Sequence, residues 1–207
     1  MYKYAVKHEY IDDRKLNIVQ YIRIDKPGNP NSLNRKPFSK EEIDTLWNWK
    51  DASPYIRVII ILIYTGCRIG ELLDLKKDNV NLEGHWFDIT ASKTKAGIRK
   101  VPIHDKVYPL IEEWYNMNDS EYLISTPSAE HFAYNNYLDS YWKPFIDQMG
   151  MKHLPHDTRH TCVSLLASAG VDQRLIRKIV GHSGQGVTET VYTHFQIDEL
   201  LEAINKI

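Results

Sequence analysis

Two arginines, two histidines and a tyrosine in this chain have the chemistry needed to attack a phosphodiester: Arg68, His156, Arg159, His182 and Tyr192. A phosphodiester is an anion, and its transition state carries more charge on the non-bridging oxygens. Arginine meets such oxygens with a flat fork of donors that stays protonated. A phenol has a pKa near ~10 and becomes a good nucleophile when cations or a base favour phenolate. This set of residues indicates phosphodiester chemistry rather than proteolysis or redox chemistry.

The five side chains lie in short motifs that follow one another in a definite order. The motifs are T-G-C-R-I-G-E from Thr65, H-D-T-R-H from His156, G-H from Gly181 and Y-T-H from Tyr192. The chain here resembles the tyrosine recombinases, the phage-integrase family. Their pattern is T-G-x-R-x-x-E, a lysine on a β-hairpin, H-x-x-R, G-H and then a tyrosine. The resemblance runs from about Phe38 to about Phe195, and five weak motifs in order make a specific signature.

The resemblance implies a role for each of these residues. Tyr192 would attack the scissile phosphate, giving a 3′-phosphotyrosyl link and a free 5′-hydroxyl. Arg68 and Arg159 would hold the phosphate, supported by His182, and His156 would accept the tyrosine proton. Because the phosphotyrosine stores the bond energy, no ATP is needed, and we expect neither a cofactor nor a metal ion.

A lysine on the second hairpin completes the implied set. By the family pattern, the lysine entering the turn is the general acid that protonates the leaving 5′-oxygen. Lys93 is preferred, and Lys95 stays open as the alternative. Glu71, Arg99 and His160, together with Lys95, are candidates for supporting the site or for contacting DNA.

Ordinary structural roles compete with these assignments. Arg68 could simply pair with Glu71, three residues on, and His182 could satisfy carbonyls at a helix end. His156 and His160 are one helical turn apart, so H-D-x-x-H also resembles the zinc-binding H-E-x-x-H. That interpretation is weaker, because aspartate is shorter than the usual base, the intervening arginine would oppose a dication, and no third ligand is evident.

Composition predicts a folded protein with uneven charge. Hydrophobic residues make up 43% of the 207-residue chain, and the formal net charge is −1, whereas DNA-binding domains usually carry a positive excess. The positive charges form two clusters along the chain: Lys93, Lys95, Arg99, Lys100 and Lys106, then Arg174, Arg177 and Lys178. We therefore expect a locally basic face on a nearly neutral domain.

Other sequence features predict a cytoplasmic protein without membrane association. The longest apolar run, Val58–Tyr64, is far shorter than the ~18 residues of a membrane span. The N-terminus has no signal-peptide layout. Cys67 and Cys162 lie in segments that read as helix, so two buried free thiols are expected rather than a disulfide.

Residues 1–36 end in a Pro/Gly/Asn-rich stretch, Lys26–Ser32, which is typical of a linker. In full-length integrases a helical DNA-binding domain precedes such a segment. The resemblance therefore implies that residues 1–36 are a remnant of that domain with its linker, and that residues 37–207 are the catalytic domain. The chain is then expected to be a fragment or the catalytic domain alone.

The expected fold is α+β, mainly helical with a small three-stranded antiparallel sheet, as in tyrosine recombinase catalytic domains. Ser39 to Glu42 form a capping box, and Pro54 suits the first turn of the next helix. Alternation between Val80 and Ile103, broken by turns at Glu83-Gly84 and Ala96-Gly97, predicts the sheet. The tail from Ile197 to Ile207 carries an amphipathic helical stripe.

The expected function is that of a site-specific DNA recombinase, or integrase, of a phage or mobile element. Its partner would be double-stranded DNA, with a tetramer on paired sites, a monomer as an isolated domain, and accessory DNA-bending proteins. Three alternatives remain open: a type IB topoisomerase, a non-catalytic DNA-binding protein that retains the fold, and a zinc hydrolase using His156 and His160.

Overall fold

The computed structural model describes residues 36–92, 95–182 and 195–207. The side chain of Lys95 is not described. Lys93, Tyr192 and the expected remnant with its linker lie outside the described residues, so the domain boundary near residue 36 remains a prediction. Within the described residues, no helix is both long enough and apolar enough to cross a membrane.

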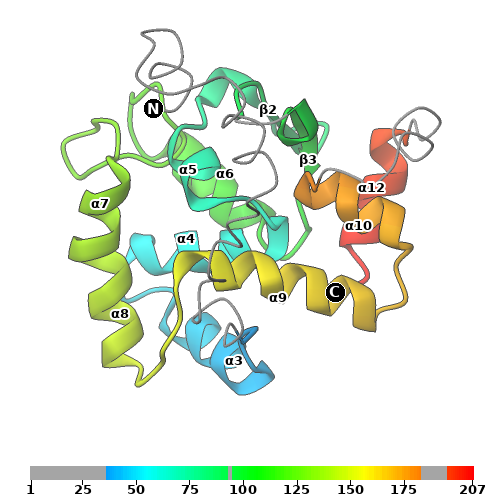
Figure 1. The fold of residues 1–207 in the computed structure, drawn as a ribbon. Coiled ribbons are helices and arrows are strands. Elements are labelled where there is room, and N and C mark those ends of the chain that lie inside the picture. The colour runs from blue at the N-terminus through cyan, green and yellow to red at the C-terminus, as the bar shows by residue number, and fades with distance from the viewer. Residues whose placement is uncertain (1–35, 93–94, 183–194) are drawn as a thin grey trace, which may run out of the picture. The chain divides into compact units, whose positions relative to one another are not determined.

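The described chain is mainly helical and carries one small sheet (Figure 1). The helices are α3 (Lys40–Trp49), α4 (Pro54–Thr65), α5 (Ile69–Leu73), α6 (Tyr108–Asn116), α7 (Tyr134–Tyr137), α8 (Lys143–Gln148), α9 (Pro155–Ser168), α10 (Gln173–Val180) and α12 (Ile197–Ile204). Short 3-10 turns cover Lys77–Asn79 and Lys95–Gly97, and a π-helical turn, Leu138–Trp142, joins α7 to α8. The strands are β1 (Val80–Asn81), β2 (Trp86–Ile89) and β3 (Arg99–Pro102).

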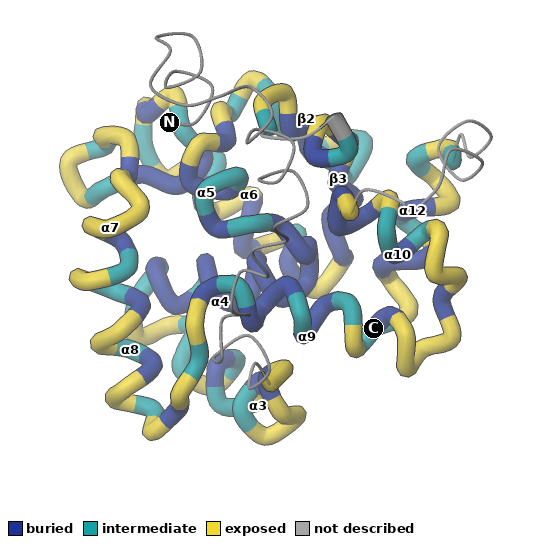
Figure 2. The backbone as a smooth tube through the Cα atoms, viewed as in Figure 1, coloured by how far each residue is buried: buried dark blue, intermediate teal, exposed yellow. Residues whose placement is uncertain are grey.

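Helix α4 is the centre of the core, because its residues beyond Arg57 are mostly apolar and are buried on every side. Its residues from Val58 to Thr65 are all buried, as the dark tube in Figure 2 shows. It packs against α9, α3 and α6. Both predicted helix starts are confirmed: Ser39 and Glu42 form the capping box of α3, and Pro54 opens α4 behind the N-cap Ser53.

The three strands pair antiparallel in the order β1-β2-β3, as the alternation predicted. Phe87 on β2 lies opposite Val80 on one side and Val101 on the other. Phe87 and Val101 are fully buried, so one face of the sheet contributes to the core. Because side chains alternate along a strand, this register also places Arg99 at 5% exposure and its neighbour Lys100 in solvent.

Gly66 brings three elements of the molecule close together. It ends α4, with φ at +64°. A Cβ atom at this position would stand 2.8 Å from Val180 Cγ1 on α10 and 3.0 Å from Cys162 Sγ on α9. Only glycine allows both the backbone conformation and this packing. The chain then turns directly into α5, whose N-cap is Arg68.

The tail helix α12 packs against β3 and α10 of the same chain. Leu200, Ala203 and Ile204 are buried in a cluster with apolar residues of α9 and α10. Polar contacts fix the last turn: the ring of His104 meets the Ile207 carbonyl at 2.5 Å, and the Asp105 amide donates to Asn205 Oδ1 at 2.9 Å. The apolar stripe predicted for the tail is thus covered by the chain itself.

Cys67 and Cys162 are buried free thiols, as the sequence predicted. Burial raises the pKa of Cys67 to about 11 and that of Cys162 to about 12. Both therefore stay protonated and behave as small apolar residues.

Candidate active site

Arg159 is the most unusual side chain of the site, because a charged group is buried with few partners. It projects from the first half of α9 and is 1% exposed. Its Nη1 donates to the Gly66 carbonyl at 2.9 Å. Its Nε and Nη2 are buried and meet no hydrogen-bond acceptor among the residues that the structure describes. Leaving a buried donor unsatisfied costs about 1–3 kcal/mol, and more for a charged group. Such an arrangement indicates a binding site for an anion.

Arg68 stands beside it at the entrance to α5. Its side chain is 39% exposed, and its Nη1 pairs with Glu71 Oε1 at 2.6 Å. The ordinary pairing that the sequence suggested is therefore present. Glu71 Oε2 also accepts the backbone amide of Arg68 at 3.1 Å, so the carboxylate fixes both the helix start and the guanidinium. The exposed part of Arg68 remains available to a ligand.

Three guanidinium groups lie near one carboxylate, Glu71, and two of them, those of Arg68 and Arg99, pair with it. Burial, followed by the positive charges of Arg68 and Arg99, lowers the pKa of Arg159 to about 10, so Arg159 stays charged at neutral pH. Burial acts to raise the pKa of Glu71, but hydrogen bonds and charge from Arg99, then from Arg68, bring it below its usual range. Three cations against one anion leave a surplus of positive charge, which favours an anionic ligand.

Glu71 and Arg99 lie behind the site rather than at its surface. The Glu71 side chain is 7% exposed and that of Arg99 is 0% exposed, with Arg99 Nη2 3.0 Å from Glu71 Oε2. Of the two roles that the sequence left open for these residues, burial favours support of the site over contact with DNA.

The three histidines gather near the two arginines. The rings of His156 and His160 meet edge to face, with centroids 4.8 Å apart, on one side of α9. His182 follows Gly181, which ends α10 with φ at +70°. Desolvation, then the charges of Arg159 and Arg68, lowers the pKa of His182 to about 4, although the residue as a whole is exposed. His182 is therefore neutral at pH 7 and can donate one hydrogen bond to a bound oxygen.

Two members of the expected set, Lys93 and Tyr192, lie outside the described residues, and the alternative Lys95 has no described side chain. Arg99 and Lys100, two members of the expected basic cluster, do not lie on one face. Arg99 points inward, while Lys100 lies 2.9 Å from the centre of the Trp86 ring on the other face of the sheet. The alternation of β3 separates these two charges.

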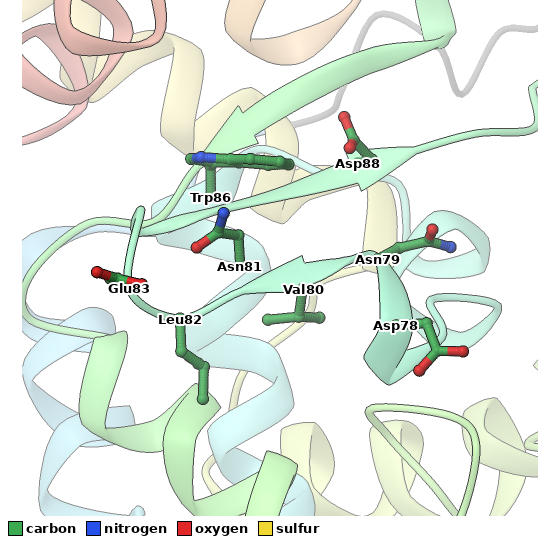
Figure 3. Close-up of a pocket in the computed structure, with 8 residues that line it drawn as sticks. All are labelled: Asp78, Asn79, Val80, Asn81, Leu82, Glu83, Trp86 and Asp88. Carbon is green, nitrogen blue, oxygen red and sulfur yellow. The ribbon is translucent and has the colours of Figure 1, made fainter.

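A surface hollow on the sheet lies over β1 and β2 (Figure 3). Its charged side chains are acidic: Asp78, Glu83 and Asp88. Such a lining repels phosphate, so this hollow does not take part in the anion site.

Sequence reasoning missed a buried polar cluster before α9. His153 stacks on Phe38 with ring centroids 3.8 Å apart, and its Nε2 lies 3.1 Å from Glu42 Oε2. Asp157, within the H-D-T-R-H motif, accepts the Leu154 amide at 2.8 Å. These contacts fix the start of the helix that carries Arg159. The only signal was that Asp157 follows His153 by one helical turn.

The zinc alternative needs a third ligand near His156 and His160. Across the described ranges, no group of three or more His, Cys, Asp or Glu side chains is arranged to hold a metal ion.

Comparisons with known proteins agree on one family. A tyrosine recombinase XerA from Thermococcus kodakarensis is 29% identical over 192 residues, covering 89% of this chain and 66% of the relative. The crystal structure of XerA recombinase superimposes with a TM-score of 0.63 at 23% identity, over 81% of this chain and 61% of that one.

The integrase of transposon Tn1549, solved in complex with circular intermediate DNA, gives a TM-score of 0.62 at 21% identity, over 80% of this chain and 63% of that one. The chain thus spans less than two thirds of the length of these solved structures and 66% of the XerA relative. The likenesses confirm the predicted fold, a mainly helical catalytic core with a three-stranded antiparallel sheet. The model of the phage integrase family matches residues 36–199, and the chain belongs to that family.

Proposed function

We propose that this chain breaks and rejoins double-stranded DNA as the catalytic domain of a site-specific tyrosine recombinase. One observation carries the proposal: beside the partly exposed Arg68, Arg159 presents two buried donors that meet no acceptor in the part of the chain that the structure describes. A phosphodiester supplies two non-bridging oxygens, which match guanidinium donors in charge and geometry.

The reaction then follows from the motif residues. Tyr192 Oη forms a bond to phosphorus, the bond from phosphorus to the 5′-oxygen breaks, and the 3′-phosphate stays on the tyrosine. His156 takes the phenolic proton, and Lys93 gives a proton to the departing 5′-oxygen. Arg68 and Arg159 hold the non-bridging oxygens, and neutral His182 donates to one of them. Rejoining reverses these steps, so no cofactor is consumed.

Assembly is part of the proposal. The isolated chain would be a monomer with α12 packed on its own β3 and α10, because that surface is already covered. On paired sites four copies would act together. Helix α12 would then detach from β3 and α10 of its own chain and dock on a neighbouring copy. Removing residues 196–207 should then impair paired-site recombination more than cleavage of single half-sites. A DNA-free tetramer in sedimentation, or equal damage to both activities, would contradict this model.

Covalent capture tests the chemistry on DNA of any sequence. Duplexes with a randomised core and a nick near the cleavage point are incubated with the protein, and DNA that stays attached on a denaturing gel is sequenced. Wild-type protein should form an adduct, and Tyr192→Phe should form none, because only the attacking oxygen is lost. Tyr134→Phe, at an exposed tyrosine, should react like wild type. DNA binding by the wild type without any adduct would instead indicate a non-catalytic DNA-binding protein.

A further inference from the structure

Arg99 differs from the other arginines of the site, because its side chain is fully buried and each of its nitrogens has a hydrogen-bond partner. Its Nε donates to the Ile179 carbonyl at 2.7 Å, and its Nη1 donates to the Gly97 carbonyl at 2.8 Å. Its Nη2 donates to Glu71 Oε2 at 3.0 Å. The same nitrogen lies 3.9 Å from Cys67 Sγ. Each nitrogen of this group has a partner and the side chain is 0% exposed, so Arg99 does not reach the surface to contact DNA.

These contacts join Arg99 to three segments that carry residues of the proposed active site. Gly97 closes the turn Lys95–Gly97, in the segment that carries the candidate general acid. Ile179 precedes the G-H dipeptide at the end of α10, and Glu71 holds Arg68 through its other oxygen. Gly181 is part of the same junction, since a Cβ atom there would stand 2.9 Å from Arg99 Nη1.

We infer that Arg99 is a positioning residue that sets the lysine hairpin, the His182 segment and the Glu71–Arg68 pair relative to one another. The inference rests on the proposed function for its chemical meaning. Arg99 does not touch the reacting atoms; it acts through the groups that do. A planar fork can point three donors at three segments at once, whereas a lysine ammonium cannot reproduce that geometry.

A purely structural arginine elsewhere in the fold provides the matched control. Arg57 is also largely buried, and it donates to the Lys50 carbonyl and to the carboxylate of Asp51, far along α4 from the site. Arg57→Gln and Arg99→Gln each remove one buried guanidinium. Arg99→Lys keeps the charge opposite Glu71 and serves as a second variant should Arg99→Gln fold poorly.

The experiment compares single-turnover cleavage of the captured half-site with cleavage of the same site carrying a 5′-bridging phosphorothiolate, at a temperature where every variant is folded. Sulfur leaves without a proton, so this substrate does not need the general acid. Arg99→Gln should cleave the ordinary substrate at least ~10²-fold more slowly than wild type, a loss typical of misplaced catalytic groups. The sulfur substrate should recover at least ~10-fold of that loss, with Arg99→Lys intermediate. The Kd for DNA should change less than ~3-fold, and Arg57→Gln should cleave both substrates at wild-type rates.

Hydrogen–deuterium exchange supplies a readout that needs no activity. Arg99→Gln should speed exchange at residues 95–98 and at 180–182, and Arg57→Gln should not. The inference is overturned if Arg99→Gln cleaves both substrates at wild-type rates, if its loss is equal on both, or if exchange in these segments is unchanged. Wild-type protein that forms no adduct would refute the proposed function instead, and exchange alone would then decide whether Arg99 holds these segments.

Discussion

Two arginines lie near opposite ends of α4, Arg57 with a 17% exposed side chain and Arg159 at 1% exposure, and their surroundings differ sharply. Near the start of the helix, Arg57 donates to the Lys50 carbonyl at 3.0 Å, pairs with Asp51 at 3.1 Å and contacts Glu113. Beyond its end, Arg159 has one partner, the Gly66 carbonyl, and two unsatisfied donors within the described chain. Arg57 makes its hydrogen bonds within the fold. Arg159 keeps donors for a ligand that the described chain does not provide.

The difference points to two roles for a buried charge: Arg57 contributes to stability, and Arg159 is suited to bind an anion. A buried charge is tolerated when its hydrogen bonds are made and is costly when they are not. Arg159 also lies close enough to Arg68 and Arg99 for their charges to lower its pKa. A cation that is kept unsatisfied and repelled by its neighbours is destabilising by itself, and a bound phosphate would relieve both costs. Sites that bind strongly are often strained in this way before the ligand arrives.

The largest expected effect is on cleavage. Arg159→Lys keeps the charge but loses the planar fork, so single-turnover cleavage should fall at least ~10²-fold, in line with the loss of a transition-state donor. Arg57→Lys should cleave at the wild-type rate when folded. Rates measured with saturating DNA make the comparison independent of affinity. If both variants lose the same factor in cleavage rate, the two arginines do not differ in function. If Arg159→Lys loses as much DNA affinity as cleavage rate, Arg159 only positions the duplex.

Stability should change in the opposite direction. Arg57→Met leaves a backbone carbonyl and two carboxylates without their partner, and should lower the free energy of unfolding by about 1–2 kcal/mol. Arg159→Met removes an unsatisfied buried charge and should raise it by about 1 kcal/mol, the Gly66 carbonyl limiting the gain. Urea titrations followed by tryptophan fluorescence measure both. A loss for Arg159→Met as large as that for Arg57→Met would show that the free site is not strained.

Inorganic phosphate should distinguish the two arginines by binding. At a concentration ten times its Kd, phosphate should stabilise wild-type protein by about 1.4 kcal/mol through mass action, because it satisfies the donors of Arg159. Arg57→Met should respond equally, and Arg159→Met should respond little. Thermal melts at constant ionic strength, with chloride as the control anion, separate this effect from general screening. A similar response to chloride would argue against a specific anion site.

The sequence was sufficient for several of the elements, and the reasons are local. The capping box at Ser39 and the alternation through β2 and β3 depend on neighbouring residues, so they could be predicted and are confirmed. The motif order identified Arg68 and Arg159, and the structure places them together. The catalytic roles of all the motif residues, Lys93 and Tyr192 included, remain predictions.

What the sequence could not give depends on contacts between distant segments. The sequence left Arg99 open between supporting the site and contacting DNA, and only the structure shows that it points inward toward Glu71. The contact of Arg159 with the Gly66 carbonyl joins residues far apart in the chain. Nor does the sequence reveal that α9 and α10 pack against Gly66.

The smallest expected effect is the pH dependence contributed by His182. Desolvation and the charges of Arg159 and Arg68 hold its pKa at about 4, against about 6.5 in an unfolded chain. Between these values the unfolded state binds a proton that the folded state does not, so stability is full above pH 6.5 and falls as the pH drops toward 4.

His182→Asn should remove part of that slope, by less than about 1 kcal/mol because the residue is exposed. The pKa of His104 is also lowered by burial, so His104 makes stability depend on pH in the same direction. The contribution of His182 is therefore the difference in pH dependence between the variant and the wild type. Thermal melts at pH 5 and pH 7.5 measure it. Saturating phosphate should shrink the difference, because a bound anion favours the protonated imidazole. Identical slopes for the two proteins would place His182 outside the positive field of the arginines.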